Sequence, residues 1–181
     1  MMPPQFQVVF AAMVDVLILL SPTIAVFVYL LLRRSAPRRS DTPAAPVVVD
    51  GSNVMYWRDN TPRIDTVVAV VAALRQAGWQ PVVWFDANAG YHLVGRYARD
   101  HELARLLGLS SRQVIVVPRG TPADPQLLTG AREMKAPVVS NDRFRDWQAD
   151  YADVLAGQMI RGRMGEDGVV LDVLTPVQMA A

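Results

Sequence analysis

The chain has no cysteine among its 181 residues and only two histidines, His92 and His101. Without cysteine it forms no disulfide and no thiolate zinc finger, and the composition agrees with a reducing compartment. Both histidines fall on or near one expected helical segment without a partner pattern. We therefore interpret them as surface residues, not as the acid–base pair of a metal-free nuclease. Metal chemistry in this chain would have to rest on oxygen ligands.

Net charge is also low, at +1, and residues 47–181 are close to neutral. Electrostatic binding of nucleic acid therefore needs a local basic patch. Two nucleotide-related patterns are missing as well. No G-x-G-x-x-G follows an expected strand, which disfavours dinucleotide binding. The first expected strand lacks an Asp-x-Asp-x-Thr pattern, which disfavours an acidic-pocket phosphatase or a receiver-like domain.

Charged residues are nearly absent from residues 8–32, where Asp15 stands alone. At about 1.5 Å per residue, this run is long enough to cross a bilayer core of about 30 Å. Asp15 at midspan would cost about 2.5–3.5 kcal/mol. We therefore place the buried part at residues 16–32, with Pro22 as a tolerated kink and Asp15 near the far interface. An intramembrane functional or partner-pairing role for Asp15 is the less favoured alternative.

Arginines flank this run on its C-terminal side only, at Arg33, Arg34, Arg38 and Arg39. The positive-inside rule then places the remainder of the chain in the cytoplasm. A cleaved signal peptide fits poorly, because no basic n-region precedes the run and no clear small-x-small site follows it. We predict a single-pass anchor in the inner (cytoplasmic) membrane at residues 1–34, a Pro/Arg-rich linker at 35–46 and a folded domain at 47–181.

Strand and helix patterns alternate along the folded domain. Short apolar runs predict four buried strands, at residues 47–49, 81–85, 114–117 and 138–139. Helical spacing between breaker residues predicts four helices, at residues 64–77, 93–107, 124–134 and 141–151. This order predicts an α/β fold with right-handed crossovers and a mostly parallel sheet between helix layers. A C-terminal β-hairpin is expected from residues 158–164 and 169–174.

Two acidic motifs come directly after expected strands. The first runs from Asp50 to Asn53, and the second from Ser140 to Asp146. Because ligands of parallel sheets bind outside the carboxyl ends of the strands, both motifs are expected at one crevice. Asp142 and Asp146 are four residues apart and would share one face of the expected helix. A charge at the mouth of a buried strand is costly without a partner, which favours carboxylates that converge on one cation.

Asp124, at the start of another expected helix, is a further candidate, although a lone aspartate there is usually a helix cap. A carboxylate pair four residues apart is usually solvated, whereas Asp50 has no evident structural need for its charge. Mg²⁺ and Mn²⁺ take oxygen ligands, often one or two carboxylates with waters and substrate phosphates. The acidic set therefore predicts a metal site that activates water for in-line displacement at phosphorus.

The segments Val-Val-Asp-Gly-Ser-Asn-Val at 48–54 and Val-Val-Ser-Asn-Asp-Arg-Phe-Arg-Asp at 138–146 resemble the signatures of NYN domains. More narrowly, they resemble the Regnase-type CCCH zinc-finger ribonucleases of the PIN-like nuclease superfamily, over about residues 47–147. The resemblance implies a PIN-like three-layer α/β/α sandwich, Mg²⁺ or Mn²⁺, and endoribonuclease cleavage of single-stranded RNA. Without cysteine the chain has no CCCH finger, and the expected membrane anchor stands in its place.

By position, the resemblance implies catalytic roles for one supporting asparagine and four metal-site aspartates, namely Asn53, Asp50, Asp124, Asp142 and Asp146. Regnase-type members often have two adjacent aspartates where this chain has Asp124-Pro125. This departure motivates an alternative, a catalytically weak or inactive NYN-like module that binds RNA or a protein at the membrane. PIN-like domains often pair, so a homodimer is a further expectation, although no dimer face is identified.

Residues around the acidic cluster are candidates for substrate contacts. We assign substrate binding to Ser52, Asn141, Arg143 and Arg145, of which the arginines suit RNA phosphates. Asp86 ends the strand at 81–85 over the same crevice, and a site role and a turn-starting role are equally favoured. Tyr56 and Trp57 can stack a base, but packing over the rim of the site is the favoured interpretation. Weaker phosphate candidates are Arg119, Arg132 and Lys135.

Overall fold

The structure is a computed structural model that describes residues 44–156 and 159–172. The predicted anchor at residues 1–34 and nearly all of the predicted linker lie outside these residues. Within the two described ranges, no helix is long and apolar enough to cross a membrane. The described residues all fall in one structural unit, Ala44–Ala181.

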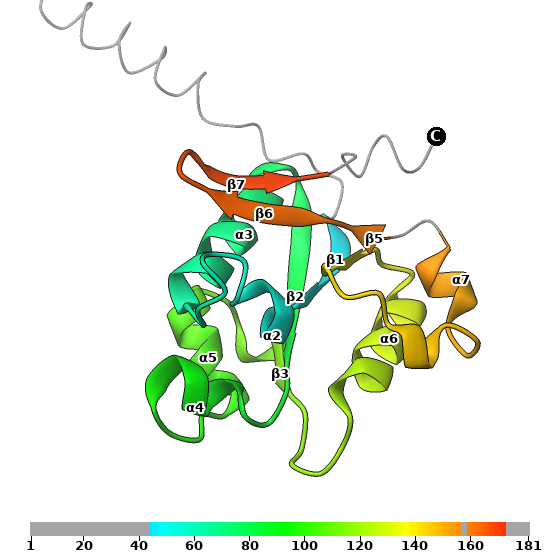
Figure 1. Ribbon diagram of the computed structural model, residues 1–181, viewed down its shortest axis with the longest axis horizontal. Helices are drawn as coiled ribbons and strands as arrows, with labels where there is room; N and C mark the ends of the chain where they lie inside the picture. Colours follow the sequence, from blue (N-terminus) through cyan, green and yellow to red (C-terminus); the bar gives the residue numbers. More distant parts are fainter. Residues whose placement is uncertain (1–43, 157–158, 173–181) are drawn as a thin grey trace, which may run out of the picture. The chain divides into compact units, whose positions relative to one another are not determined.

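Five parallel strands form the central sheet, in the order β3-β2-β1-β4-β5 (Figure 1). Their bounds are Ala45–Asp50 for β1, Trp79–Phe85 for β2, Val114–Val116 for β3, Val138–Val139 for β4 and Met159–Ile160 for β5. β1 lies in the middle, with Asp50 opposite Trp84 of β2 and Val49 opposite Val139 of β4. The predicted parallel sheet is confirmed. Its valine-rich strands are buried between helices and need no polar alternation.

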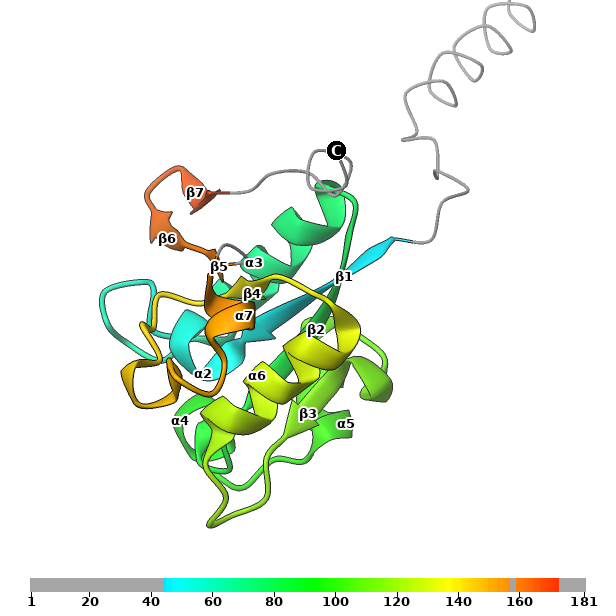
Figure 2. The same cartoon turned by 90° about the vertical axis from the view of Figure 1, so that its right-hand side faces the viewer.

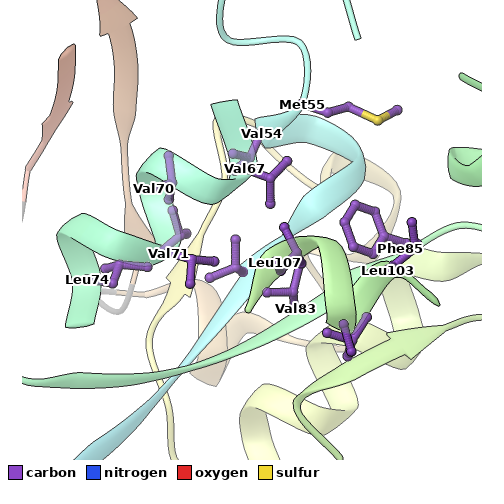
Figure 3. Close-up of a cluster of buried hydrophobic side chains, with 14 of the residues drawn as sticks. Val54, Met55, Val67, Val70, Val71, Leu74, Val83, Phe85, Leu103 and Leu107 are labelled. Atoms are coloured by element: carbon purple, nitrogen blue, oxygen red, sulfur yellow. The ribbon is translucent and has the colours of Figure 1, made fainter. Parts of the chain in front are cut away.

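Helices cover both faces of this sheet (Figures 1 and 2). One face carries α3 (Ile64–Gln76) and α5 (Asp100–Leu107), and the other carries α6 (Ala123–Met134) and α7 (Ala152–Leu155). Successive residues of β1 alternate between the two cores, because side chains of a strand point to opposite faces. Val47 and Val49 pack in the core beneath α3 and α5, and Val48 packs in the core beneath α6. Figure 3 shows side chains of α3 and α5 in the first of these cores, among them Val67, Val71 and Leu103. The expected three-layer α/β/α arrangement is present.

The single helix predicted at residues 93–107 is wrong. Two helices occupy this region, α4 (Ala89–Val94) and α5, and Gly95 ends the first with a left-handed φ of 73°. A residue with φ above zero interrupts a right-handed helix, and glycine adopts it without a Cβ penalty. Glu102 then starts α5 by accepting a hydrogen bond from the Arg99 backbone N–H at 2.9 Å. A short 3₁₀ turn, Ser111–Gln113, leads from α5 into β3.

The helix predicted at residues 141–151 is also wrong. The Asp142 side chain accepts a hydrogen bond from the Phe144 backbone N–H at 2.7 Å, and Phe144 takes a left-handed φ of 47°. Aspartate competes in this way with helical hydrogen bonds, and a left-handed residue ends any helix that reaches it. Only a 3₁₀ turn, Arg145–Trp147, and the short α7 form here. Asp142 and Asp146 therefore do not share one helix face.

The C-terminal hairpin is confirmed as β6 (Gly162–Gly165) paired antiparallel with β7 (Gly168–Leu171). The residues just before it differ from the prediction. Met159 and Ile160 join the main sheet as β5, parallel to β4, and only then does the chain turn into the hairpin. The junction between β5 and β6 consequently lies beside the second acidic motif, where Ser140 follows β4.

Candidate active site

The two acidic motifs meet at the carboxyl edge of the sheet, because β1 and β4 are adjacent parallel strands. Asp50 is the last residue of β1, and the alternation along this strand places its side chain on the Val48 face, beneath α6. Asp124 lies in the first turn of α6, on that same face. A four-residue helix, α2 (Gly51–Val54), starts directly after Asp50 and carries Asn53.

Asp50 is almost fully enclosed, with 8% of its surface exposed. Its two carboxyl oxygens accept hydrogen bonds from the Asn53 backbone N–H at 3.1 Å and from the Ser140 hydroxyl at 2.8 Å. Burial raises the pKa of Asp50 to about 6, against the opposing effect of these two hydrogen bonds, and the charges of Asp124 and Asp142 raise it further. A single negative charge is thus held in place at a site that disfavours it.

Ser140 joins the two acidic motifs. It is fully buried, donates its hydroxyl to Asp50, and accepts the Asp142 backbone N–H on the same oxygen at 3.0 Å. From the sequence Ser140 was predicted only as part of the second motif, and this linking role was missed. The signal was the adjacency of two strands, since Asp50 and Ser140 each follow a paired residue of β1 or β4.

An open cleft of about 470 Å³ lies over this edge. Its lining combines three predicted carboxylates and two predicted arginines with neighbouring residues, namely Asp124, Asp142, Asp146, Arg143, Arg145, Asn53, Asn141, Phe144 and Trp147. Burial raises the pKa of Asp124, and the charges of Asp142, Asp146 and Asp86 add to this effect. Four aspartates therefore lie close enough to repel one another. We call the cleft of about 470 Å³ with this lining the acidic cleft.

The donors of the acidic cleft suit a hard divalent cation. They are carboxylate and amide oxygens. Burial raises the pKa values of Asp50 and Asp124, and the charges of neighbouring aspartates raise them further, a repulsion that a bound cation relieves. Among residues 44–156 and 159–172, no three acidic or histidine side chains are arranged closely enough to ligate one ion together. The set fits an ion held by one or two carboxylates with waters and substrate oxygens completing its shell, a mode that Mg²⁺ favours.

The sequence matches the family of the Zc3h12a-like ribonuclease NYN domain over residues 43–162. The chain belongs to this family. It therefore carries a ribonuclease NYN domain, and RNA is the substrate class that the domain implies. The match spans both acidic motifs and the whole α/β core, as expected from the resemblance.

Two solved structures similar to this NYN domain are of one protein, the nuclear protein-only RNase P 2 (PRORP2) of Arabidopsis thaliana. The first has a TM-score of 0.56 and 18% identity over 92% of this chain, and the second a TM-score of 0.55 and 16% identity over 84%. This chain covers 36% of each of those chains. At such identity the likeness concerns the fold alone. No curated protein matches the sequence.

Asn53 of the NYN domain connects three segments around the acidic cleft. Its side-chain oxygen accepts hydrogen bonds from the Trp57 indole N–H at 2.8 Å and from the Asn141 backbone N–H at 3.0 Å. Trp57 also packs against Gly162 of the hairpin, where an added Cβ would lie 2.7 Å from the indole ring. These contacts agree with packing at the rim, not base stacking, as the role of Trp57.

Arg161 and Gly162 hold the loop of the second motif from the far side. The Arg161 guanidinium donates to the backbone carbonyls of Ser140, at 2.7 Å, and Asp142. The Asn141 side chain exchanges two hydrogen bonds with the Gly162 backbone, at 2.8 and 3.2 Å. Asn141 was predicted to bind substrate, but its side-chain amide is hydrogen-bonded to the start of β6 instead. Arg161 was missed, because nothing in the sequence indicated that β5 ends beside β4.

Two further predicted residues lie outside the lining of the acidic cleft. The Ser52 hydroxyl accepts the Asp86 backbone N–H at 2.8 Å and so ties α2 to the end of β2. The Asp86 carboxylate accepts the Asn88 backbone N–H at 2.6 Å, which is the turn-starting role considered for it. Packing requires glycine at position 51, since an added Cβ would lie 2.5 Å from the Phe85 ring.

Proposed function

We propose that this chain is a divalent-metal-dependent endoribonuclease that hydrolyses phosphodiester bonds of single-stranded RNA at the acidic cleft. The observation that carries the proposal is the joining of Asp50 to the second motif through Ser140, with Asp124 facing them from α6. A structural role alone does not explain why a buried strand ends in a carboxylate that is disfavoured there. Binding a cation does explain it.

Mg²⁺ or Mn²⁺ would be held among Asp50, Asp124, Asp142 and Asp146, with one or two of these carboxylates as direct ligands and waters and substrate oxygens completing the shell. When bound, such an ion lowers the pKa of a water and stabilises negative charge on the leaving oxygen. The protein's contribution is positional. Ser140 and the Asn53 backbone fix the two oxygens of Asp50, and the Asn53 side chain fixes the backbone at Asn141.

Arg143 and Arg145 would hold the RNA backbone. Both line the acidic cleft beside the aspartates, and both are exposed. A guanidinium pairs well with phosphate oxygens through two parallel hydrogen bonds. These two arginines supply local positive charge at the mouth of the cleft in a domain whose net charge is close to zero.

The test is cleavage of a single-stranded RNA by the purified full chain with Mg²⁺ or Mn²⁺. Cleavage is expected with either ion and is expected to disappear in EDTA and in Asp142→Asn. The matched control is Asp167→Asn, which lies in the hairpin turn between β6 and β7. Cleavage that survives both EDTA and Asp142→Asn would sink the mechanism.

We propose that residues 1–34 hold this nuclease at the inner membrane with its catalytic domain in the cytoplasm. The apolar run at residues 8–32 and the arginines that follow it support this placement. Sedimentation of the full chain with membranes, and its release when residues 1–34 are deleted, is the expected result. Equal release of both forms would remove the anchor from the proposal.

Pro125 stands next to Asp124, where a second carboxylate is expected from the family resemblance. This departure supports a second candidate function, that of an NYN module that binds RNA without cutting it. Its expected signature differs from that of the nuclease. Single-stranded RNA would bind to the full chain, and neither Mg²⁺ nor Mn²⁺ would yield products. Replacing Pro125 by Asp would then be expected to produce cleavage if the missing carboxylate is the cause.

A further inference from the structure

A second cleft, of about 510 Å³, opens at the same edge of the sheet as the acidic cleft. Its lining comes from the loop before α5, the start of α5, the 3₁₀ turn before β3 and the end of β3, namely Tyr97, Arg99, Asp100, His101, Ser111, Val116 and Pro118. The two clefts share none of the described residues. We call the second one the Tyr97 cleft.

Each cleft includes residues at the carboxyl end of a strand, β4 for the acidic cleft and β3 for the Tyr97 cleft. β3 is separated from β1 by β2 alone. With neighbouring strands about 4.8 Å apart, the ends of β1 and β3 are about 10 Å from each other. Figure 1 shows α4 and α5 near the end of β3 and the second acidic motif on the other side of β1. The Tyr97 cleft lies at α5 and the acidic cleft at α6, on opposite faces of the sheet, so an RNA strand that reaches both has to cross the carboxyl ends of the strands.

Tyr97 is exposed on a loop that the fold fixes firmly. Its own surface is 45% exposed, whereas Ala98 beside it is buried at 1%. The Arg96 guanidinium donates to the Tyr97 carbonyl at 3.1 Å and pairs with Glu102 at 2.7 Å, and this pairing lowers the pKa of Glu102 to about 2. On the other side the loop packs so tightly on Gly90 that an added Cβ would lie 2.5 Å from the Ala98 nitrogen.

The charge of the Tyr97 cleft suits an anionic strand. Arg99 brings a fixed positive charge to its lining, and the His101 side chain lies in the same lining. The one carboxylate there, Asp100, uses an oxygen to accept the Val116 backbone N–H at 3.0 Å, which ties α5 to β3. A rigid exposed aromatic ring beside a guanidinium is the arrangement that stacks an unpaired base and holds its phosphate.

We propose that the Tyr97 cleft binds a nucleotide of single-stranded RNA that flanks the scissile phosphate, with its base stacked on Tyr97 and its phosphate at Arg99. This inference rests on the proposed nuclease function and adds a substrate-length requirement to it. RNA that reaches both clefts binds more tightly than RNA that fills the acidic cleft alone. The Tyr97 cleft takes no part in the chemical step.

The experiment compares RNA of about 4 and about 16 nucleotides as substrates of the full chain, a range that spans known single-strand site sizes. Tyr97→Ala is expected to raise KM for the long RNA about tenfold and to leave kcat, and all parameters for the short RNA, unchanged. Tyr97→Phe, which keeps the ring, is expected to behave as wild type. Tyr91→Ala is the matched control, because Tyr91 is a 50% exposed tyrosine on α4 outside the cleft lining.

Three results would overturn the subsite: an unchanged KM for the long RNA, equal effects on both lengths, or an equal effect of Tyr91→Ala. If the wild-type chain cuts no RNA, the proposed function fails, and the subsite is judged by binding instead. Fluorescence anisotropy of the long RNA on the same variants then supports it if Tyr97→Ala alone weakens binding about tenfold. Unchanged anisotropy rejects it.

Discussion

The carboxyl groups of Asp50 and Asp146 lie in opposite surroundings. Asp50 is 8% exposed and has both oxygens hydrogen-bonded to the protein. Asp146 is exposed in the 3₁₀ turn at the rim of the acidic cleft. In the first case the fold determines where the charge sits and what it costs, whereas in the second water competes for every contact. The inner part of the site is preorganised, and the outer part adapts to what binds.

The largest effect that separates the two is on catalysis. Asp50→Asn is expected to lower kcat by on the order of a thousandfold, the scale reached when one preorganised charge stabiliser is removed. Asp146→Asn is expected to lower it only about tenfold, because water can replace a rim carboxylate in the shell of a cation. Steady-state cleavage of one RNA by both variants measures the difference, with circular dichroism as the check on folding. Equal losses in the two variants would remove the distinction between the inner and outer site.

The second effect concerns stability and has a defined pH window. The pKa of Asp50 is raised from 3.8 to about 6, so the folded state binds the proton more tightly than the unfolded state. Stability from this group is then greatest below about pH 4 and falls as pH rises toward 6, by about 3 kcal/mol in all. Asp50→Asn removes this dependence. Relative to wild type, the variant is expected to gain about 3 kcal/mol between pH 4 and pH 7.

Urea unfolding of wild type and Asp50→Asn in EDTA measures this gain, and subtracting the two curves cancels the titration of all other groups. Asp167→Asn, in the hairpin turn, serves as the control and is expected to follow wild type, because its charge is not among those that raise the pKa of Asp50 or Asp124. A difference between wild type and Asp50→Asn that stays constant from pH 4 to pH 7 would contradict the cost assigned to the buried charge. An active site that gains stability when its charge is removed fits the trade-off between stability and function.

The inner site was largely predictable from the sequence, and the reason is the strand. Val47 to Val49 form an apolar run that has to be buried, and the residue after it must then lie at the mouth of the sheet. By the same reasoning, the apolar run Val138-Val139 predicts that Ser140 lies at the mouth of the sheet. The order of strands and helices supplied the remainder, since parallel crossovers bring both mouths to one edge.

The residues of the outer site were predictable but their backbone conformation was not, because local hydrogen bonds decided it. The spacing of Asp142 and Asp146 suits a helix, but the Asp142 side chain captures the Phe144 N–H and Phe144 turns left-handed. The break at Gly95 is of the same kind, since glycine is tolerated in helices and also ends them. The short β5 was missed because two residues, Met159 and Ile160, give too little pattern to separate a strand from the hairpin that follows.

Replacing Arg161 is expected to have the smallest of the three effects. It tests whether the preorganised part of the site extends from Asp50 to the second motif. Both of its hydrogen bonds to the Ser140 and Asp142 carbonyls come from one guanidinium nitrogen. Arg161→Met keeps the length of the side chain and removes both, so kcat is expected to fall about tenfold, as for other outer partners of metal ligands. Arg161→Lys is expected to restore most of kcat, because one ammonium group can donate to both carbonyls. Arg163→Met, on exposed β6, is the control.

The KM and the local hydrogen exchange show how Arg161 acts. If it positions the loop, KM stays within about twofold of wild type, and the Asp142 amide, which donates to the Ser140 hydroxyl, exchanges faster in Arg161→Met while global stability is unchanged. If instead its charge binds RNA directly, KM rises, kcat holds and the Asp142 amide stays protected. In that event Arg161 does not order the second motif, which is held instead by the hydrogen bonds of Asn141 to Gly162 and Asn53 and of Asp142 to Ser140.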